Sequence, residues 1–74
     1  MTDQEDIKTR QKIGQNLKEI REKRNLTQLE LAEQAKINIT HYAKIERGET
    51  NTRIPTLRVL CRVLKVKSSD ILPF

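Results

Sequence analysis

The 74-residue sequence predicts an all-α fold, one compact domain of five helices. Three observations predict it. Apolar residues recur at helical spacing in separate segments, residues that cap and end helices lie between these segments, and no segment shows the alternation of a strand. Apolar residues make up 35% of the chain and aromatic residues 3%, so the core must be small and mostly aliphatic. A chain this short buries roughly 60% of its unfolded surface, which makes a second subunit a natural source of further burial.

The first helix is expected over residues 10–24. Ile13, Leu17 and Ile20 stand at positions i, i+4 and i+7 and therefore share one face. Asn25 follows the last turn and can end the helix in the left-handed conformation.

Residues 1–9 carry one apolar side chain after Met1, namely Ile7. They are expected to form a flexible arm or a loose extension of the first helix. Residues 10–74 then form the domain proper, with a dimerisation surface toward its C-terminal end.

The second and third helices are short and carry clear start signals. Thr27 is a good N-cap, and Glu30 three places later completes a capping box, so a helix begins here and ends near Ala35. Asn38 is expected to cap a third helix that runs to about Glu46 and is closed by a glycine.

About three residues, 36–38, join these two helices. Two helices that cross at roughly 90–120° through such a turn make a helix-turn-helix. The usual form has Gly in the turn. Lys36 stands there instead, and a left-handed Lys is tolerated at modest cost.

A fourth helix is expected from Pro55, which suits the first helical position because its missing N–H has no partner there. Its inward side consists of Leu57, Leu60, Cys61 and Leu64. Ser68 is expected to cap a last short turn that ends before Pro73.

The fourth helix is apolar on a second side as well. Val59, Val63 and Val66 cluster at about 180–240° from Leu57 around the helix axis. A helix with two apolar sides must bury both, so this side is expected to contact a second subunit. The expected interface residues are Val59, Val63, Val66, Ile71, Leu72 and Phe74. The alternative is that the last helix covers this side within the chain.

One side of the third helix is left open to a partner. At about 100° per residue, Tyr42 and Ile45 fall on the buried side. The opposite side contains no acidic residue. It consists of Ile39, Thr40, Ala43, Lys44 and Arg47. The major groove of B-DNA admits a helix with such a side.

Four of these residues are the expected base contacts. Ile39 offers an apolar surface to a thymine methyl group, although it is also placed to pack under the second helix. Thr40 can hydrogen-bond a base edge or a phosphate. Ala43 is small enough to let the backbone approach, and Lys44 can reach guanine O6 and N7 or a phosphate.

The charge supports a polyanionic partner. The net charge is +5 and the pI is about 9.7, which fits nucleic acid first and an anionic membrane surface second. Gln28 lies in the first turn of the second helix, where free N–H groups and the helix dipole attract a phosphate. The expected phosphate contacts are Gln28, Asn38, His41, Arg47 and Arg53. A plain solvent-exposed position is the alternative for His41 and Arg53.

Several other classes of protein are disfavoured. Cys61 is the only cysteine, which excludes a disulfide within the chain and fits a reducing cytoplasm. Cys61 and His41 are too few to hold zinc, so no metal and no cofactor are expected. His41 has no acid or nucleophile at suggestive spacing, which argues against an enzyme. No apolar run approaches the roughly 20 residues of a membrane span, and the N-terminus is not a signal peptide.

Four segments together resemble a known family. They are "LTQLELAEQA", "IERGE", "PTLRVLCRVLKV" and "SSDIL". With these segments, residues 11–72 resemble the Xre/Cro-type helix-turn-helix family, which includes phage repressors. The small controller proteins of restriction–modification operons are especially similar in length.

The resemblance implies a lambda-repressor-like domain that regulates transcription as a homodimer on a partly palindromic site in double-stranded DNA. RNA polymerase is a further partner that such a regulator can have. In several family members an Arg late in the first helix pairs with the Glu of "IERG". Arg21 and Glu46 occupy these places and are expected to form a salt bridge.

Two alternatives stay open at this point. An antitoxin from a toxin–antitoxin operon would bind DNA and also a toxin, often through an extra segment, of which this chain has little. An adaptor would use the same fold for protein contacts only, which the acid-free side of the third helix disfavours.

Overall fold

The computed structural model describes residues 3–74, and within this range it contains five helices and no strand. They are α1 (Asp3–Lys23), α2 (Gln28–Ala35), α3 (Ile39–Glu46), α4 (Ile54–Leu64) and α5 (Ser68–Ile71). The predicted all-α domain with a helix-turn-helix is confirmed.

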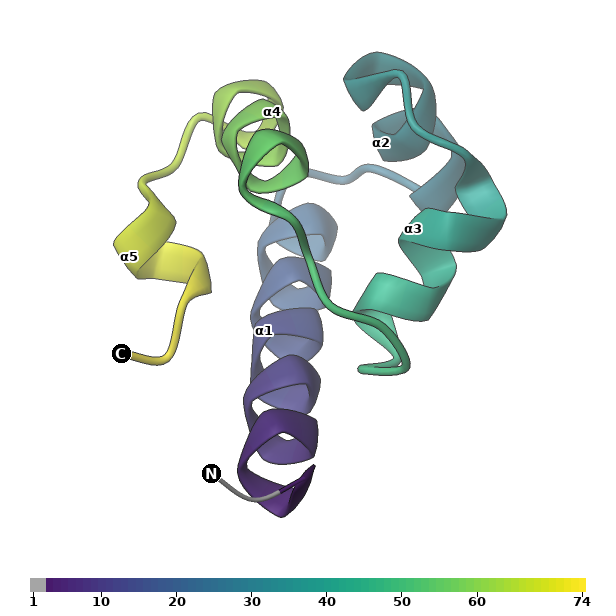
Figure 1. Ribbon diagram of the computed structural model, residues 1–74. Coiled ribbons are helices and arrows are strands. Elements are labelled where there is room, and N and C mark those ends of the chain that lie inside the picture. The colour runs from purple at the N-terminus through teal and green to yellow at the C-terminus, as the bar shows by residue number, and fades with distance from the viewer. Residues whose placement is uncertain (1–2) are drawn as a thin grey trace.

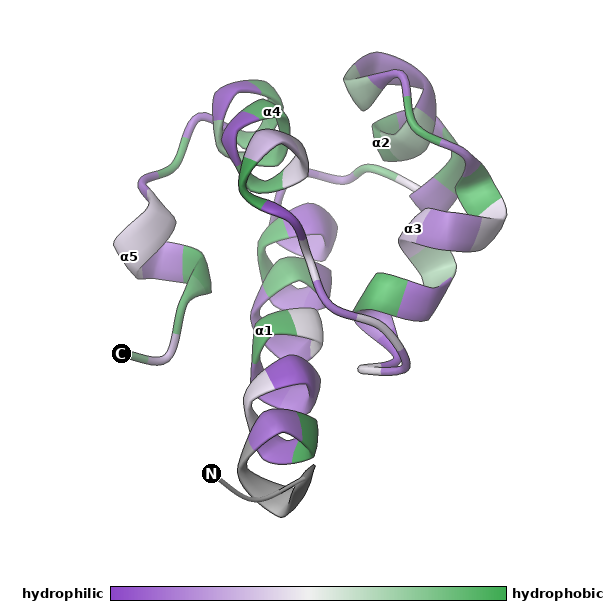
Figure 2. Ribbon diagram, viewed as in Figure 1, coloured by the Kyte–Doolittle hydropathy of each residue, from purple (hydrophilic) through white to green (hydrophobic). Residues whose placement is uncertain are grey.

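The long helix α1 forms the spine of the molecule (Figure 1). It contacts α3 on one side and α5 on another, and α2 packs against both α3 and α4. The first coloured turns of α1 are mostly hydrophilic, while apolar segments lie farther along, where the other helices surround it (Figure 2). The largest fully buried side chains are Tyr42, Leu17, Leu31, Ile45, Leu60, Leu64 and Ile71. One mostly aliphatic core therefore holds all five helices together.

The predicted caps of α2 and α3 are present. The backbone N–H of Glu30 donates to Oγ1 of Thr27 at 3.0 Å, and the N–H of Thr27 donates to Oε1 of Glu30 at 2.8 Å. Asn38 Oδ1 accepts from the N–H groups of Thr40 at 2.8 Å and His41 at 3.2 Å. These bonds satisfy N–H groups that have no partner within a helix, so both helices of the motif start where local chemistry places them.

Left-handed residues end three of the helices. Asn25 has φ 58°, as predicted, and Lys65 ends α4 with φ 59°. Lys36 adopts φ 58° and ψ 41° in the turn between α2 and α3, so Lys does accept the conformation that Gly would normally supply. A residue with a Cβ pays roughly 1–2 kcal/mol there. The turn is therefore maintained by the packing of α2 and α3 on the core.

One helix start follows an alternative raised from the sequence, and two others differ from the prediction. Helix α1 begins at Asp3, so residues 3–9 continue the helix, which was one of the two alternatives. Helix α4 begins at Ile54, one residue before Pro55, because the second helical position also lacks an intrahelical acceptor for its N–H. Lys67, not Ser68, is the N-cap of α5, because the Asp70 carboxylate accepts the Lys67 backbone N–H at 2.9 Å.

Gly14 is buried where α1 crosses the end of α3. A Cβ atom at this position would overlap the backbone carbonyl of Glu46. The absence of a side chain lets α3 lie directly on α1, which fixes the position of the helix-turn-helix. None of the helices over residues 3–74 is long and apolar enough to cross a membrane.

Candidate nucleic-acid interface

Helix α3 has one side buried in the core and the opposite side exposed to solvent. Tyr42 is 0% exposed and Ile45 is 1% exposed, as the sequence predicted. On the opposite side Thr40 and Lys44 are exposed, and Arg47 is exposed just beyond the last turn. Rotation of α3 about its axis would expose Tyr42 and Ile45, so the core determines which residues face outward.

The other two residues of the predicted base-reading side are less open. Ala43 is half-buried. Ile39 is also half-buried and packs against the core, so only part of its side chain faces outward. Ile39 therefore contributes to packing within the domain, and only its exposed atoms are available to contact a thymine methyl group.

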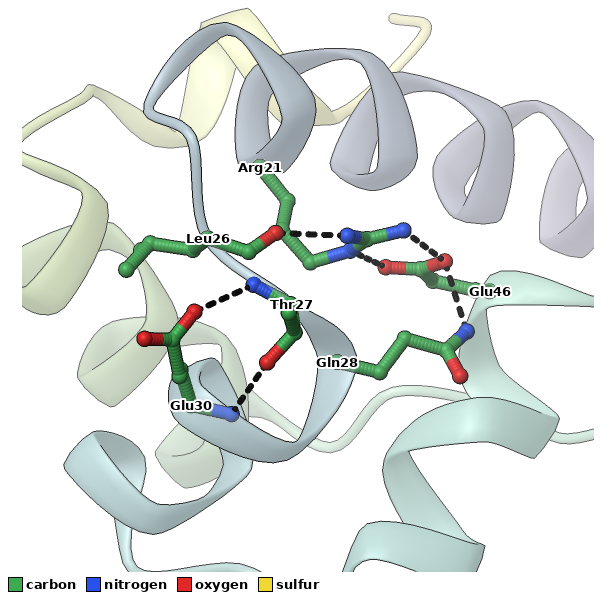
Figure 3. Close-up of polar contacts among 6 residues, drawn as sticks. All are labelled: Arg21, Leu26, Thr27, Gln28, Glu30 and Glu46. Carbon is green, nitrogen blue, oxygen red and sulfur yellow. Dashed lines mark hydrogen bonds and ion pairs between the residues drawn. The ribbon is translucent and has the colours of Figure 1, made fainter.

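A buried ion pair ties α1 to α3 (Figure 3). Arg21 Nε lies 2.7 Å from Glu46 Oε2, and Arg21 Nη2 donates to Glu46 Oε1 at 3.3 Å. The two side chains are 10% and 3% exposed. Arg21 Nη1 also donates to the carbonyl of Leu26 at 2.6 Å, next to the N-cap of α2. One guanidinium group thereby holds the start of α2 and the end of α3 in a fixed relation.

Gln28 joins this network through a hydrogen bond that the sequence did not predict. Its Nε2 donates to Glu46 Oε1 at 2.9 Å, and the residue is half-buried (Figure 3). An amide nitrogen carries two N–H donors, so one remains for another acceptor. The predicted phosphate contact of Gln28 stays a prediction, and it would use this second N–H. No local pattern connects residues 28 and 46, which is why the hydrogen bond could not be predicted.

The network keeps Glu46 ionised. Burial by itself would raise the pKa of the Glu46 carboxyl group, but Arg21, the nearby Tyr42 hydroxyl and Gln28 together lower this pKa below its ordinary value. The hydrogen bond to Glu46 raises the pKa of Arg21. Burial, followed by the carboxylate of Glu46, raises the pKa of Tyr42 far above its ordinary value. The Tyr42 hydroxyl has no hydrogen bond of good geometry among the described residues.

The remaining predicted phosphate contacts lie within α3, at its two ends and in the loop that follows it. Arg47 is exposed, and its Nε lies 2.7 Å from Glu49 Oε2 in an exposed ion pair. His41 and Arg53 are exposed. Asn38 is exposed as well, but its carbonyl oxygen already caps α3, so only its amide N–H groups are free for a phosphate. These positions are compatible with backbone contacts, which stay predictions.

The apolar surface of α4 and α5 differs from the predicted one. Ile71 is 0% exposed and lies in the core, so its predicted contact with a second subunit is wrong. Leu72, the two valines of α4 (Val59 and Val63) and Val66 just after that helix are half-buried and pack against the core, whereas Phe74 is 84% exposed. Ile54, which is not among the predicted interface residues, is 68% exposed. A groove of about 400 Å³ is lined by Ile54, Leu57, Arg58, Cys61, Ser68 and Leu72.

The described residues contain no cluster of three or more His, Cys, Asp or Glu side chains that could hold a metal ion. Cys61 is half-buried at the groove between α4 and α5. Burial and then the charge of Asp70 raise the pKa of its thiol, so Cys61 behaves as a small apolar side chain.

The geometry of α2 and α3 agrees with comparisons to known proteins. A family model described as helix-turn-helix matches residues 17–71. The chain belongs to this family. Its members are the Xre/Cro-type helix-turn-helix proteins, DNA-binding regulators of the repressor and controller type, so the resemblance found in the sequence is confirmed.

Individual relatives are regulators by name. The immunity repressor protein of Bacillus phage phi105 is 39% identical over 59 residues, which cover 80% of this chain and 41% of that protein. This chain therefore spans about two fifths of the length of that curated relative. The restriction-modification controller protein C.AhdI from Aeromonas hydrophila superposes with a TM-score of 0.82 at 25% identity, covering 85% of this chain and 96% of that chain. The clp gene regulator ClgR from Corynebacterium glutamicum superposes with a TM-score of 0.81 at 25% identity, covering 85% of this chain and 67% of that chain.

Proposed function

We propose that this helix-turn-helix protein is a sequence-specific regulator of transcription that acts as a homodimer on a partly palindromic operator. The outer side of α3 carries the proposal. Thr40 and Lys44 stand on a rigid helix that is anchored by Tyr42 and Ile45 on its other side. A short, fixed helix with small, polar and basic side chains outward suits the major groove, where base edges can be distinguished.

In this proposal Ile39, Thr40, Ala43 and Lys44 contact bases. Phosphate contacts come from Gln28, Asn38, His41, Arg47 and Arg53. Two of the proposed phosphate contacts, Arg47 and Arg53, carry a full positive charge, which makes four in a dimer. Each neutralised phosphate contributes roughly −0.9 to the slope of log K against log salt, so the slope should be about −4.

The homodimer follows from how little DNA one copy can read. One short helix covers few base pairs, whereas two recognition helices about 34 Å apart read half-sites one helical turn apart. The exposed Phe74 and Ile54, with the half-buried Leu72 and valines of α4, give the proposed subunit contact. An apolar surface of this kind on a small domain is a natural contact between copies.

The named relatives support the regulatory role. A phage immunity repressor and a restriction–modification controller are among the proteins that this chain resembles. Such a regulator acts in the cytoplasm and would also contact RNA polymerase if it activates transcription. In-vitro transcription from the operator with purified polymerase separates activation from repression by the direction of the change.

Selection of bound DNA from a random pool, followed by a footprint on the enriched site, tests the proposal. A two-fold symmetric motif protected over two adjacent major grooves is the expected result. If no sequence is enriched and the protein instead binds a protein partner, the adaptor alternative is correct. Binding of both a DNA site and a toxin would favour the antitoxin alternative.

A further inference from the structure

The hydrogen bond between Gln28 and Glu46 assigns Glu46 a second role, which rests on the proposed function. We propose that Glu46 is a positioning residue for phosphate binding. It holds the side-chain amide of Gln28 in one orientation at the N-terminus of α2, so that an N–H donor is ready for a DNA phosphate. Gln28 makes the contact, and Glu46 acts through it.

The carboxylate determines which end of the amide faces it. Glu46 Oε1 accepts from Gln28 Nε2 at 2.9 Å and from Arg21 Nη2 at 3.3 Å. An ionised carboxylate can only accept, so the nitrogen of Gln28 must face Glu46 and its oxygen must turn away, as Figure 3 shows. The nitrogen keeps a second N–H in the amide plane. An amide free to flip could instead present its oxygen to a phosphate, which would repel it.

Arg21 makes this arrangement compatible with an anion nearby. A lone carboxylate under the phosphate site would repel DNA, but the guanidinium of Arg21 lies 2.7 Å from Glu46 and offsets its charge. Arg21 also binds the Leu26 carbonyl at 2.6 Å, which fixes the backbone just before the cap of α2. The free N–H groups and dipole of α2 thus keep their attraction for a phosphate.

The bond also links two parts of the proposed interface. Glu46 belongs to α3, the proposed base-reading helix, whereas Gln28 belongs to α2. When Glu46 holds Gln28, the phosphate contact moves with the base-reading side as one rigid unit. The side chain has already lost its rotamer freedom before DNA arrives, which reduces the entropic cost of binding.

A double-mutant cycle in DNA binding tests the inference. The proteins are the wild type, Gln28→Ala, Glu46→Gln and the double variant, and the probe is the duplex selected by the wild type at constant salt. Loss of one positioned hydrogen bond per subunit should weaken binding about five- to tenfold. Glu46→Gln should weaken it similarly, and the double variant should bind no more weakly than Gln28→Ala. Each Kd is corrected for the folded fraction measured by circular dichroism.

Glu49→Gln is the matched control. It removes the same charge from an exposed residue beside α3, where its carboxylate pairs with Arg47. Loss of a negative charge near DNA and release of Arg47 should leave binding equal or tighter. The two substitutions are chemically identical, so opposite effects on Kd would separate positioning of Gln28 from a general change in charge.

Gln28→Asn keeps the Arg21–Glu46 pair intact and so addresses any unfolding of the Glu46 variant. Its amide is one methylene shorter and cannot keep both contacts, so it should bind as weakly as Gln28→Ala. Additive losses in the cycle, or a Gln28→Asn protein that binds like the wild type, would overturn the positioning role. Failure of the wild type to select any DNA would instead reject the proposed function. In that case the Gln28 side-chain amide signals in NMR still test the Glu46 contact, because they should move toward free-glutamine shifts in Glu46→Gln.

Discussion

Replacement of Arg21 by Met should remove a large share of the stability of the domain. Met fills most of the volume of the Arg side chain but leaves Glu46, 3% exposed, as an unpaired buried carboxylate. Loss of one partner of a buried ion pair typically costs about 3–5 kcal/mol. A domain of this size has roughly 4–11 kcal/mol of stability in total. We therefore expect the Tm to fall by roughly 15 °C or more.

The dependence of this loss on pH tests its cause. In the wild type the folded-state pKa of Glu46 lies below its unfolded value of about 4.5, so the carboxylate adds stability above that pH and loses it as the pH falls through the folded-state pKa. In Arg21→Met, burial should dominate and raise the folded-state pKa above the unfolded value. The cost of the substitution should then be largest near neutral pH and should shrink as Glu46 becomes protonated. Urea unfolding of both proteins across this range measures the difference in the free energy of unfolding.

Arg47→Met provides the control within the same chain. The Arg47–Glu49 pair has the same 2.7 Å separation, but its side chains are 53% and 52% exposed. Its loss should have no clear effect on the unfolding free energy at any pH, because water screens the pair. The double variant Arg21→Met/Glu46→Leu should recover most of the stability, since it leaves no unpaired charge. The reasoning is refuted if Arg21→Met costs no more than Arg47→Met, or costs the same at all pH values.

Three further substitutions give distinct outcomes. Gly14→Ala should destabilise the protein by about 1–3 kcal/mol in urea unfolding, because its Cβ would overlap the Glu46 backbone; a gain would mean that α1 and α3 do not lie this close. Lys36→Gly should raise the unfolding free energy by up to about 1 kcal/mol, because it relieves a left-handed residue at φ 58°, and a loss would contradict that conformation. Phe74→Glu, at an 84% exposed position, should shift the protein from dimers to monomers in sedimentation without lowering its Tm. Leu29→Glu, at a 53% exposed position on α2, is the control and should leave the dimer intact. A dimer that survives Phe74→Glu would place the subunit contact elsewhere.

The elements of the fold followed from local chemistry. Thr27 and Asn38 mark helix starts through bonds that span only two or three residues, so the pattern of side chains is enough to locate them. The buried side of α3 followed similarly from the spacing of Tyr42 and Ile45. The sequence therefore predicted both helices of the motif and the exposure of Thr40, Lys44 and Arg47 on the side opposite the core.

Contacts between distant parts of the chain were less predictable. The bond between Gln28 and Glu46 and the close approach at Gly14 depend on how α1, α2 and α3 are placed in three dimensions. Ile71 has the same apolar character whether it enters the core or meets another subunit, so sequence alone could not distinguish the two. The Arg21–Glu46 pair was expected only because the family resemblance supplied the long-range pairing that periodicity lacks.

A comparison of selected DNA sites for the wild type and Thr40→Ala tests most directly whether the outer side of α3 reads bases. Thr40 is exposed and its side chain makes none of the hydrogen bonds that cap α3, so the substitution should leave the fold intact. The account predicts a changed base preference at two symmetry-related positions of the motif, with the rest retained. The same motif bound with uniformly lower affinity, or no motif for either protein, would contradict it.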